Sequence, residues 1–283
     1  MGPGLLGGSV HLAVRAAGLG CHRVAVGRNP QRLQLALDAD AADEVTTDFA
    51  TALDGADLVV VCTTIGSFPA IFERMAPHLP GGCVVTDVGS TKQVVVGQAR
   101  RLLGRSTQFV GAHPMAGGEK TGVQYARADL FDRATCIVTP TQSSPRSAVA
   151  RVEAFWRTLG CRVIRMTPAA HDRAVATVSH LPHAAAACLM RLADRSGHLD
   201  LAGAGLLDMT RIASGDPDLW VDIFATNRRS VVASIDRFVR ELTALRDAID
   251  GDRRRRVRRL LDEPRQARDA WIDRRYQRDE VEP

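Results

Sequence analysis

Short apolar runs and helical patterns alternate along the first half of this chain. Buried strands are predicted at residues 23–26, 58–62, 83–86, 108–110 and 136–138. Helical patterns are predicted between them at residues 30–39, 67–78 and 92–103. Such alternation is typical of βαβ units and a mostly parallel sheet, whose ligands bind at the carboxyl ends of the strands. A last strand is expected at 162–166.

Strand patterns stop after Met166. Pro168 can start a long apolar helix at 169–195, interrupted by Pro182. Further helical patterns cover residues 201–214, 217–249 and 253–276. We therefore expect an all-helical second domain over 167–283, which covers the ligand edge of the sheet and forms a dimer interface.

Three glycines at the start of the chain have the GxGxxG spacing. Gly2, Gly4 and Gly7 precede a helical pattern at 9–17. In a dinucleotide site such glycines form a tight turn and let the pyrophosphate lie on the helix N-terminus. With the alternation that follows, they predict an α/β, Rossmann-type dinucleotide-binding domain over 1–166.

The glycine motif normally follows the central first strand of the sheet, but only Met1 precedes Gly2. Without that strand, the hydrogen-bonding edges of its neighbours are left unpaired. We therefore expect that the native reading frame starts upstream, or that this chain lacks a first β-strand that its relatives have.

The end of the second strand bears on the choice of cofactor. NAD-selective sites usually carry Asp or Glu there for the ribose 2′-hydroxyl. This chain has Gly27 followed by Arg28, and a guanidinium beside a small residue suits the 2′-phosphate of NADP. The chain is thus predicted to prefer NADP, with NAD as the alternative; the competing interpretation of Arg28 is a surface arginine.

His113 lies in the segment Gly-Ala-His-Pro-Met-Ala-Gly-Gly-Glu (111–119), directly after a short apolar strand. Pro114 biases His113 toward an extended backbone, and the small neighbours leave room for a ligand. A histidine pKa near neutral suits accepting a proton from a hydroxyl. The alternative is a loop histidine packed against its own turn.

Two polar segments of the second half add to this. His180 and His183 are three residues apart on one helical face, next to Pro182. A third ligand of suitable spacing does not accompany them, so a pocket-lining role, or simple packing of the two rings, is favoured over a metal site and no metal is expected. Arg211 lies in the polar segment 208–220 and could clamp a carboxylate.

Composition adds a few constraints. A chain of 283 residues has room for about two domains. Its net charge of +5 comes from arginine, since only Lys92 and Lys120 are lysines. The six scattered cysteines predict reduced thiols and a cytoplasmic protein.

The arginine run 253–256 suggests nucleic-acid binding, but interspersed acids and apolar residues favour an amphipathic helix at a dimer surface.

Five segments together resemble the prephenate/arogenate dehydrogenase family of tyrosine biosynthesis. The resemblance spans nearly the whole chain and rests on GLLGGS (4–9), TDVGSTK (86–92), GAHPMAGGE (111–119), HDRAVATVSHLPH (171–183) and DMTRIASGDPDLW (208–220). It implies oxidation of the ring C4 alcohol of prephenate or arogenate, with loss of the ring carboxylate as carbon dioxide.

The resemblance also implies roles for single residues. His113 matches the base that accepts the 4-hydroxyl proton, and Ser90 matches a serine that hydrogen-bonds near His113 and the nicotinamide. Arg211 matches the arginine that holds a substrate carboxylate. The other substrate-facing positions are His183, His180, Glu119 and Trp220. The expected cofactor-binding residues are Gly2, Gly4, Leu6, Gly7, Arg28, Asn29, Thr63 and Ser90. A homodimer without a nucleic-acid or membrane partner is expected.

Gly118 departs from the Ser or Thr that the family often has before the glutamate, which leaves the choice between keto and amino side chains open. One alternative is therefore a dehydrogenase of an amino-substituted prephenate analogue. Because of the missing strand, another is a catalytically impaired dinucleotide-binding protein. Rossmann enzymes that act on β-hydroxyacids usually rely on a lysine in the helical half. No lysine follows Lys120 here, which counts against that class of enzyme.

Overall fold

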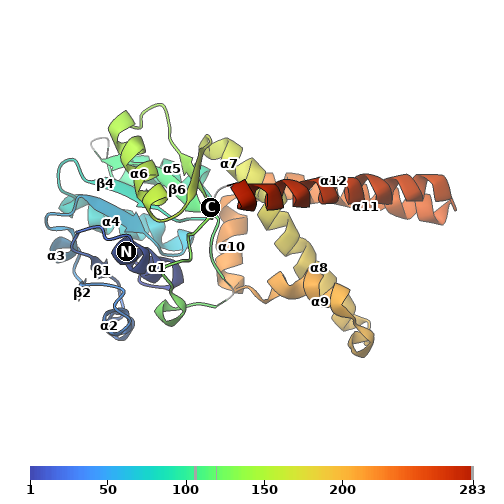
Figure 1. The fold of residues 1–283 in the computed structure, drawn as a ribbon, viewed down its shortest axis with the longest axis horizontal. Helices are drawn as coiled ribbons and strands as arrows, with labels where there is room; N and C mark the ends of the chain where they lie inside the picture. Colours follow the sequence, from blue (N-terminus) through green and yellow to red (C-terminus); the bar gives the residue numbers. More distant parts are fainter. Residues whose placement is uncertain (105–106, 119, 282–283) are drawn as a thin grey trace. The chain divides into compact units, whose positions relative to one another are not determined.

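The computed structural model describes residues 1–104, 107–118 and 120–281, with side chains through Arg274 (Figure 1). The strands are β1 (Val24–Val26), β2 (Glu44–Thr46), β3 (Leu58–Val61), β4 (Val84–Asp87), β5 (Gln108–Phe109), β6 (Gly111–Pro114), β7 (Thr135–Thr139) and β8 (Arg162–Arg165). The helices of the first half are α1 (Leu5–Ala16), α2 (Pro30–Asp38), α3 (Phe49–Leu53), α4 (Phe68–Met75), α5 (Gln93–Leu102) and α6 (Arg146–Thr158).

The later helices are α7 (Pro168–Val175), α8 (Leu181–Arg195), α9 (Ala204–Thr210), α10 (Pro217–Thr226), α11 (Arg228–Asp250) and α12 (Arg254–Val281). Short helical turns are η1 (Ile65–Ser67), η2 (Ala76–His78), η3 (Val123–Tyr125), η4 (Ala176–His180), η5 (Leu199–Leu201) and η6 (Arg211–Ser214), of which η4 is a π-helical turn.

The sheets are mostly parallel, as the alternating pattern predicts. β1 pairs with β2, and β4 lies between β3 and β5, all in parallel. In the third sheet, β7 pairs with β8 in parallel and with β6 in antiparallel orientation. The Rossmann-type expectation for the fold is thereby confirmed.

Two residues link the first sheet to the second. The amide of Gly2 donates to the carbonyl of Val26 on β1 at 2.9 Å. The carbonyl of Met1 accepts from the amide of Cys62 just after β3 at 2.8 Å, and the Met1 ammonium donates to Val60 at 2.7 Å. Met1 and Gly2 thus bridge β1 and β3, where the central strand of such a sheet is expected.

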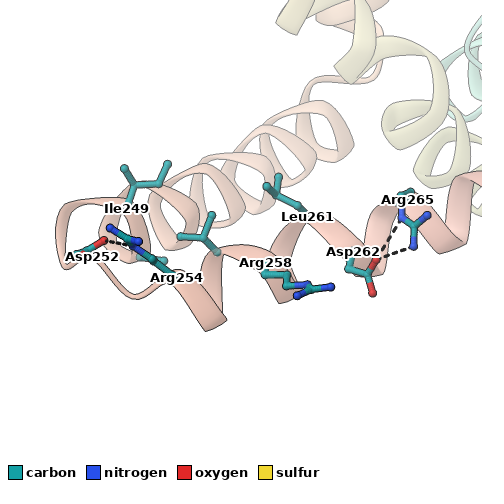
Figure 2. Close-up of a pocket in the computed structure, with 9 residues that line it drawn as sticks. Ile249, Asp252, Arg254, Arg258, Leu261, Asp262 and Arg265 are labelled. Carbon is teal, nitrogen blue, oxygen red and sulfur yellow. Dashed lines mark hydrogen bonds and ion pairs between the residues drawn. The ribbon is translucent and has the colours of Figure 1, made fainter.

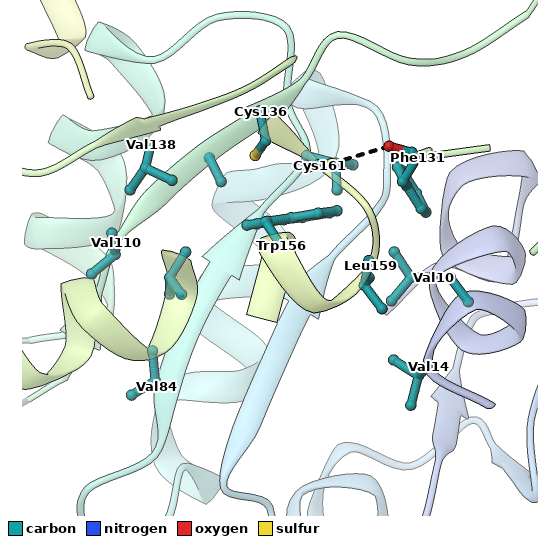
Figure 3. Packing of buried hydrophobic residues seen from close by; sticks show 14 of the residues in the cluster. Val10, Val14, Val84, Val110, Phe131, Cys136, Val138, Trp156, Leu159 and Cys161 are labelled. Atoms are coloured by element: carbon teal, nitrogen blue, oxygen red, sulfur yellow. Dashed lines mark hydrogen bonds between the residues drawn. The ribbon is translucent and has the colours of Figure 1, made fainter. Parts of the chain in front are cut away.

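Hydrophobic cores cover both faces of the sheet, because successive strand residues point to opposite sides. Val84 of β4 belongs to one core with α1 and α6, in which Trp156 is fully buried and packs edge-on against Phe131 (Figure 3). The next residue, Val85, belongs to the other core with α3, α4 and α5. That second core also contains Ile223 of α10, so it anchors a helix of the C-terminal half beside the strand ends.

The helical half is more broken than the sequence pattern indicates. The helix expected at 169–195 is divided by the π-helical turn η4, which begins at Ala176 and not at Pro182. Pro182 lies in the first turn of α8, where a missing amide hydrogen is tolerated. The helix expected at 217–249 is divided at Asn227, and the one expected at 201–214 is α9 followed by η6.

The chain forms two compact units, Met1–Val231 and Val232–Pro283. The domain boundary at residue 166 stays a prediction. In the second unit, α12 follows α11 and pairs several arginines with nearby acids, such as Arg254 with Asp252 and Arg265 with Asp262 (Figure 2). None of the described helices is long and apolar enough to cross a membrane.

Candidate active site

A buried ion pair lies at the carboxyl end of β4. Asp87 ends the strand and Lys92 precedes α5; both are fully buried, and the Lys92 ammonium pairs with the Asp87 carboxylate. Asp87 also accepts from the amide of Gly89 at 2.8 Å and from the amide of Ala112 at 3.1 Å. Asp87 therefore ties the loop that carries Ser90 to β6, the strand that carries His113.

His113 lies within β6, opposite Ile137 of β7, and not in a loop after the strand as the sequence suggested. Its Nδ1 is 2.9 Å from Nε2 of His171, and Nδ1 of His171 is 2.8 Å from Oδ1 of Asp172. Burial lowers the pKa of His113 well below its usual value, and nearby His171 and Lys92 lower it further. His113 is therefore neutral at pH 7, which suits a proton acceptor.

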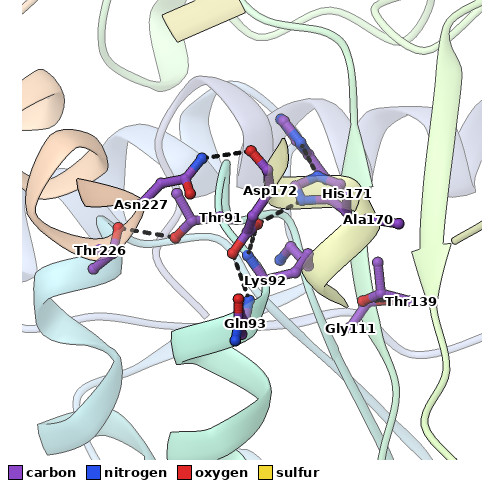
Figure 4. Close-up of polar contacts among 12 residues, drawn as sticks. Thr91, Lys92, Gln93, Gly111, Thr139, Ala170, His171, Asp172, Thr226 and Asn227 are labelled. Carbon is purple, nitrogen blue, oxygen red and sulfur yellow. Dashed lines mark hydrogen bonds and ion pairs between the residues drawn. The ribbon is translucent and has the colours of Figure 1, made fainter. Parts of the chain in front are cut away.

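Asp172 of α7 holds the start of α5 in place. Its carboxylate accepts from the backbone amides of Lys92 at 2.8 Å and Gln93 at 2.9 Å (Figure 4). Burial favours a higher pKa for Asp172, but the hydrogen bonds from His171 and from these two amides outweigh it and lower that pKa. The Asp172 carbonyl accepts from the Asn227 amide at 2.7 Å. The Asp172 carboxylate is thus ionised and held by His171 and the start of α5, while Asn227 holds its backbone carbonyl.

His180 and His183 converge on Trp220 of α10. The His183 ring stacks on Trp220 with ring centroids 3.5 Å apart and an interplanar angle of 9°. The His180 ring lies edge-on to Trp220 at 6.1 Å. Burial lowers the pKa of His180 to about 4 and also lowers that of His183. A Cβ atom at Gly215 would lie 2.7 Å from Nε1 of Trp220, so the small residue lets these rings pack.

Two buried ring nitrogens in this cluster, Nε2 of His180 and Nδ1 of His183, have no hydrogen-bond partner among the described residues. A buried polar atom without a partner costs free energy unless a ligand or water satisfies it. These two nitrogens are therefore atoms that only a ligand or a water molecule would satisfy.

Arg211 begins η6 and is exposed. It directly precedes Ile212, whose backbone hydrogen-bonds with His183. Ser90 is half-buried in the loop between β4 and α5, and no hydrogen bond joins it to His113 in the described part of the chain. Glu119, predicted at the pocket mouth, lies outside the described residues.

Helix α10 closes over the ends of the parallel strands. The Asp222 carboxylate accepts from the amide of Gly66 in η1 at 2.9 Å. The hydroxyl of Thr91, next to Ser90, donates to Thr226 at 2.9 Å (Figure 4). The histidines and Trp220 are thereby placed at the carboxyl ends of the strands, where ligands bind in such sheets.

The glycine turn fits a dinucleotide. Gly2 has φ +81°, and a Cβ atom there would lie 2.6 Å from Thr63. A Cβ atom at Gly7 would lie 2.3 Å from the carbonyl oxygen of Gly2. Gly4 has open space around it and precedes α1, whose first turn contains Leu6 and has no side-chain cap. The N-terminus of α1 can therefore receive a phosphate.

Arg28 and Asn29 follow β1 and are exposed. The Asn29 side chain caps α2, since its oxygen accepts from the amides of Gln31 at 2.9 Å and Arg32 at 3.2 Å. Asn29 therefore has a structural role, and contact of either residue with a cofactor stays a prediction.

Sequence reasoning gave no role to four buried residues of the site, namely Asp87, Lys92, His171 and Asp172. One feature of the sequence could have pointed to two of them: His171 and Asp172 are adjacent and lie in the first turns of a helix that is capped by Thr167. The contact of His171 with His113, however, joins residues 58 positions apart.

Comparison with known proteins covers both halves of the chain. Residues 10–165 match the family model for the prephenate dehydrogenase nucleotide-binding domain, and residues 167–263 match the model for its dimerization domain. A prephenate dehydrogenase of Bacillus subtilis is 32% identical over 255 residues, which is 88% of this chain and 69% of the relative.

Two solved structures are similar over nearly their whole length. A prephenate dehydrogenase from A. aeolicus, in complex with hydroxyphenyl propionate and NAD+, superposes with a TM-score of 0.88 at 33% identity, covering 94% of this chain and 95% of that one. An arogenate dehydrogenase of Synechocystis superposes with a TM-score of 0.82 at 29% identity, covering 95% and 98%.

Proposed function

The chain belongs to the prephenate dehydrogenase family and is an oxidoreductase of the prephenate/arogenate type, and from this premise we propose that His113 is the base of its reaction. The observation that carries the proposal is a buried, neutral histidine next to Ala112, whose amide bonds to Asp87 at the carboxyl end of β4. A positioned base of this kind contributes about 10²–10⁴ to a rate.

In the proposed reaction the substrate is prephenate or arogenate, with a hydroxyl and a hydrogen on ring C4. His113 accepts the hydroxyl proton as the hydride leaves C4, and the ring carboxylate departs as carbon dioxide. The ring becomes aromatic, and the phenolate oxygen takes a proton. The nicotinamide cofactor, when bound, supplies the hydride acceptor.

Other residues hold the substrate in this proposal. Arg211 forms a paired hydrogen bond with a substrate carboxylate, as a guanidinium fork does best. His180 and His183 offer their unpartnered ring nitrogens to polar groups, and Trp220 backs the His183 ring. The role of Ser90 near the nicotinamide stays a prediction, as does that of Glu119 at the pocket mouth.

The cofactor is NAD or NADP. Gly2, Gly4, Leu6 and Gly7 bring the N-terminus of α1 to the pyrophosphate, and Thr63 lies against the same turn. The A. aeolicus relative is a complex with NAD+. Arg28 favours NADP here, because a guanidinium pairs well with a 2′-phosphate.

The test follows reduced-nicotinamide absorbance with prephenate and arogenate, each with NAD and NADP, for wild type and His113→Asn. We expect turnover in at least one combination and a loss of kcat of about 10²–10⁴ in the variant, with cofactor affinity little changed.

His78→Asn is the matched control, because His78 is an exposed histidine on η2. It should keep wild-type kcat. A His113→Asn enzyme with the wild-type kcat would remove His113 from the role of base.

We also propose a cytoplasmic homodimer. The match to a dimerization domain supports self-association, and exposed apolar side chains such as Leu207 (72% exposed) and Met209 (67%) offer a surface for it. Sedimentation should give about twice the 30.6 kDa chain mass. A monomer at micromolar concentration would contradict the proposed dimer.

The cysteines support the proposed cytoplasmic location. All six are free thiols, which is typical of a reducing compartment.

A further inference from the structure

We propose that His171 and Asp172 are positioning residues that set the tautomer of His113, so that its Nε2 is the atom that accepts the substrate proton. The proposal rests on the proposed function of His113 and adds two residues that the sequence motifs leave without a role. It follows from a hydrogen-bonded chain of three buried side chains.

The chain of hydrogen bonds starts at Asp172. Both of its carboxylate oxygens accept backbone amides at the start of α5, Oδ1 from Lys92 at 2.8 Å and Oδ2 from Gln93 at 2.9 Å. An ionised carboxylate has no hydrogen to donate. The hydrogen in the 2.8 Å contact between Asp172 and His171 therefore sits on Nδ1 of His171.

The next contact follows from the first. His171 is fully buried, and burial lowers its pKa, so its ring is neutral at pH 7. A neutral imidazole with its hydrogen on Nδ1 has a lone pair on Nε2. The hydrogen in the 2.9 Å contact between the two histidines therefore sits on Nδ1 of His113.

His113 then presents a lone pair on Nε2, its remaining ring nitrogen. When that atom accepts a proton, the ring becomes positively charged and its Nδ1–H still donates to His171. His171 in turn is held by the Asp172 carboxylate, which stabilises positive charge along the pair. Burial acts in the opposite sense and lowers the His113 pKa, as do the nearby His171, Lys92 and His180.

Helix α7 also fixes the direction of the His171 ring. Its N-terminus is capped by the Thr167 hydroxyl, which accepts from the Ala170 amide at 3.2 Å. Asn227 holds the Asp172 carbonyl at 2.7 Å (Figure 4). The His171 and His113 rings meet at 65° with centroids 5.1 Å apart, so they make a directed hydrogen bond and do not stack.

Two substitutions at one position separate positioning from mere packing. His171→Leu removes the acceptor for Nδ1–H of His113, and kcat should fall on the order of 10²-fold or more while KM changes little. His171→Gln keeps a side-chain oxygen that can accept the same hydrogen. It should restore kcat to within about tenfold of wild type. Urea unfolding of both variants reports whether each is folded.

The tautomer itself is read by long-range ¹H–¹⁵N NMR of the wild-type protein with ¹⁵N-labelled histidine, the His113 signals being assigned by their loss in His113→Asn. We expect the hydrogen of neutral His113 on Nδ1. A hydrogen on Nε2 would overturn the proposal, as would wild-type kcat in folded His171→Leu. This readout needs no substrate, so a wild-type protein that oxidises neither prephenate nor arogenate would refute the proposed function alone.

Discussion

Single side chains of this site use some polar atoms in contacts within the protein and leave others without a partner among the described residues. Asn29 uses its oxygen on two amides of α2, which leaves neighbouring Arg28 as the charged side chain after β1. The ring of His183 packs on Trp220 with one buried nitrogen left without a partner among the described residues. The polar atoms that can bind a ligand are therefore those without a hydrogen-bond partner inside the protein.

Arg28→Ala should change cofactor choice. If the guanidinium pairs with the 2′-phosphate of NADP, its loss should lower kcat/KM for NADP about 10-fold or more and leave NAD nearly unaffected, since a charge-assisted hydrogen bond contributes about 1.5–3 kcal/mol. Steady-state kinetics with both cofactors measures the ratio. Arg146→Ala, an exposed arginine on α6, is the control. An unaltered ratio in Arg28→Ala would contradict the assignment.

At the level of helices and strands, the break between α10 and α11 places Asn227 where it can join several helices. Asn227 lies at this break and is buried. Its amide nitrogen donates to the Asp172 carbonyl at 2.7 Å and lies 3.3 Å from Nδ1 of His180. A continuous helix from 217 to 249 would be the simpler structure. The break instead lets one side chain join α10 and α11 to α7 and η4.

Asn227→Ala should therefore destabilise the protein. Removing the donor leaves the buried Asp172 carbonyl without this partner, which costs about 1–3 kcal/mol in the free energy of unfolding. Urea denaturation measures the change. Gln34→Ala on α2, an exposed amide side chain, should stay within about 0.5 kcal/mol of wild type. Equal stability of the two variants would show that Asn227 does not link these helices.

Across the whole molecule, buried and partly buried histidines link stability to pH. Burial lowers the pKa of His180 to about 4 and that of His11 to about 3, and it also lowers those of His113, His171 and His183. Between the usual histidine pKa of about 6.5 and these values, the unfolded chain binds protons that the folded chain does not. Folding is therefore opposed as pH falls.

The free energy of unfolding should be at its plateau above about pH 7 and fall as pH drops from about 6.5 toward 4. Each such histidine contributes about 1.4 kcal/mol per pH unit while only the unfolded chain holds its proton. Urea unfolding at pH 8, 6.5, 5.5 and 4.5 measures this slope, and His11→Gln should reduce it. A flat profile over this range would contradict the neutral, buried state of these histidines.

Much of the fold was predictable from the sequence, because its signals are local. Apolar runs of strand length between helical patterns specify βαβ units, and the glycine spacing specifies a turn before α1. His113 was identified because its motif is contiguous. The interruption of the helix at 169–195 was predicted at Pro182 but lies at η4, and the break at Asn227 was not predicted. Asn227 meets its partner Asp172 only through the tertiary fold, which the apolar period does not encode.

The fold class, the family and the residues of the five motifs follow from the amino-acid sequence alone, because each is encoded within a few neighbouring positions. Which atoms of those residues meet depends on the folded chain. His171 lies 58 positions from His113, and Asp172 lies 80 from Lys92, so their contacts require the folded sheet and α7 together. Hydrogen-bond direction and burial are properties of that assembled environment, and they determine which His113 nitrogen is free to accept a proton.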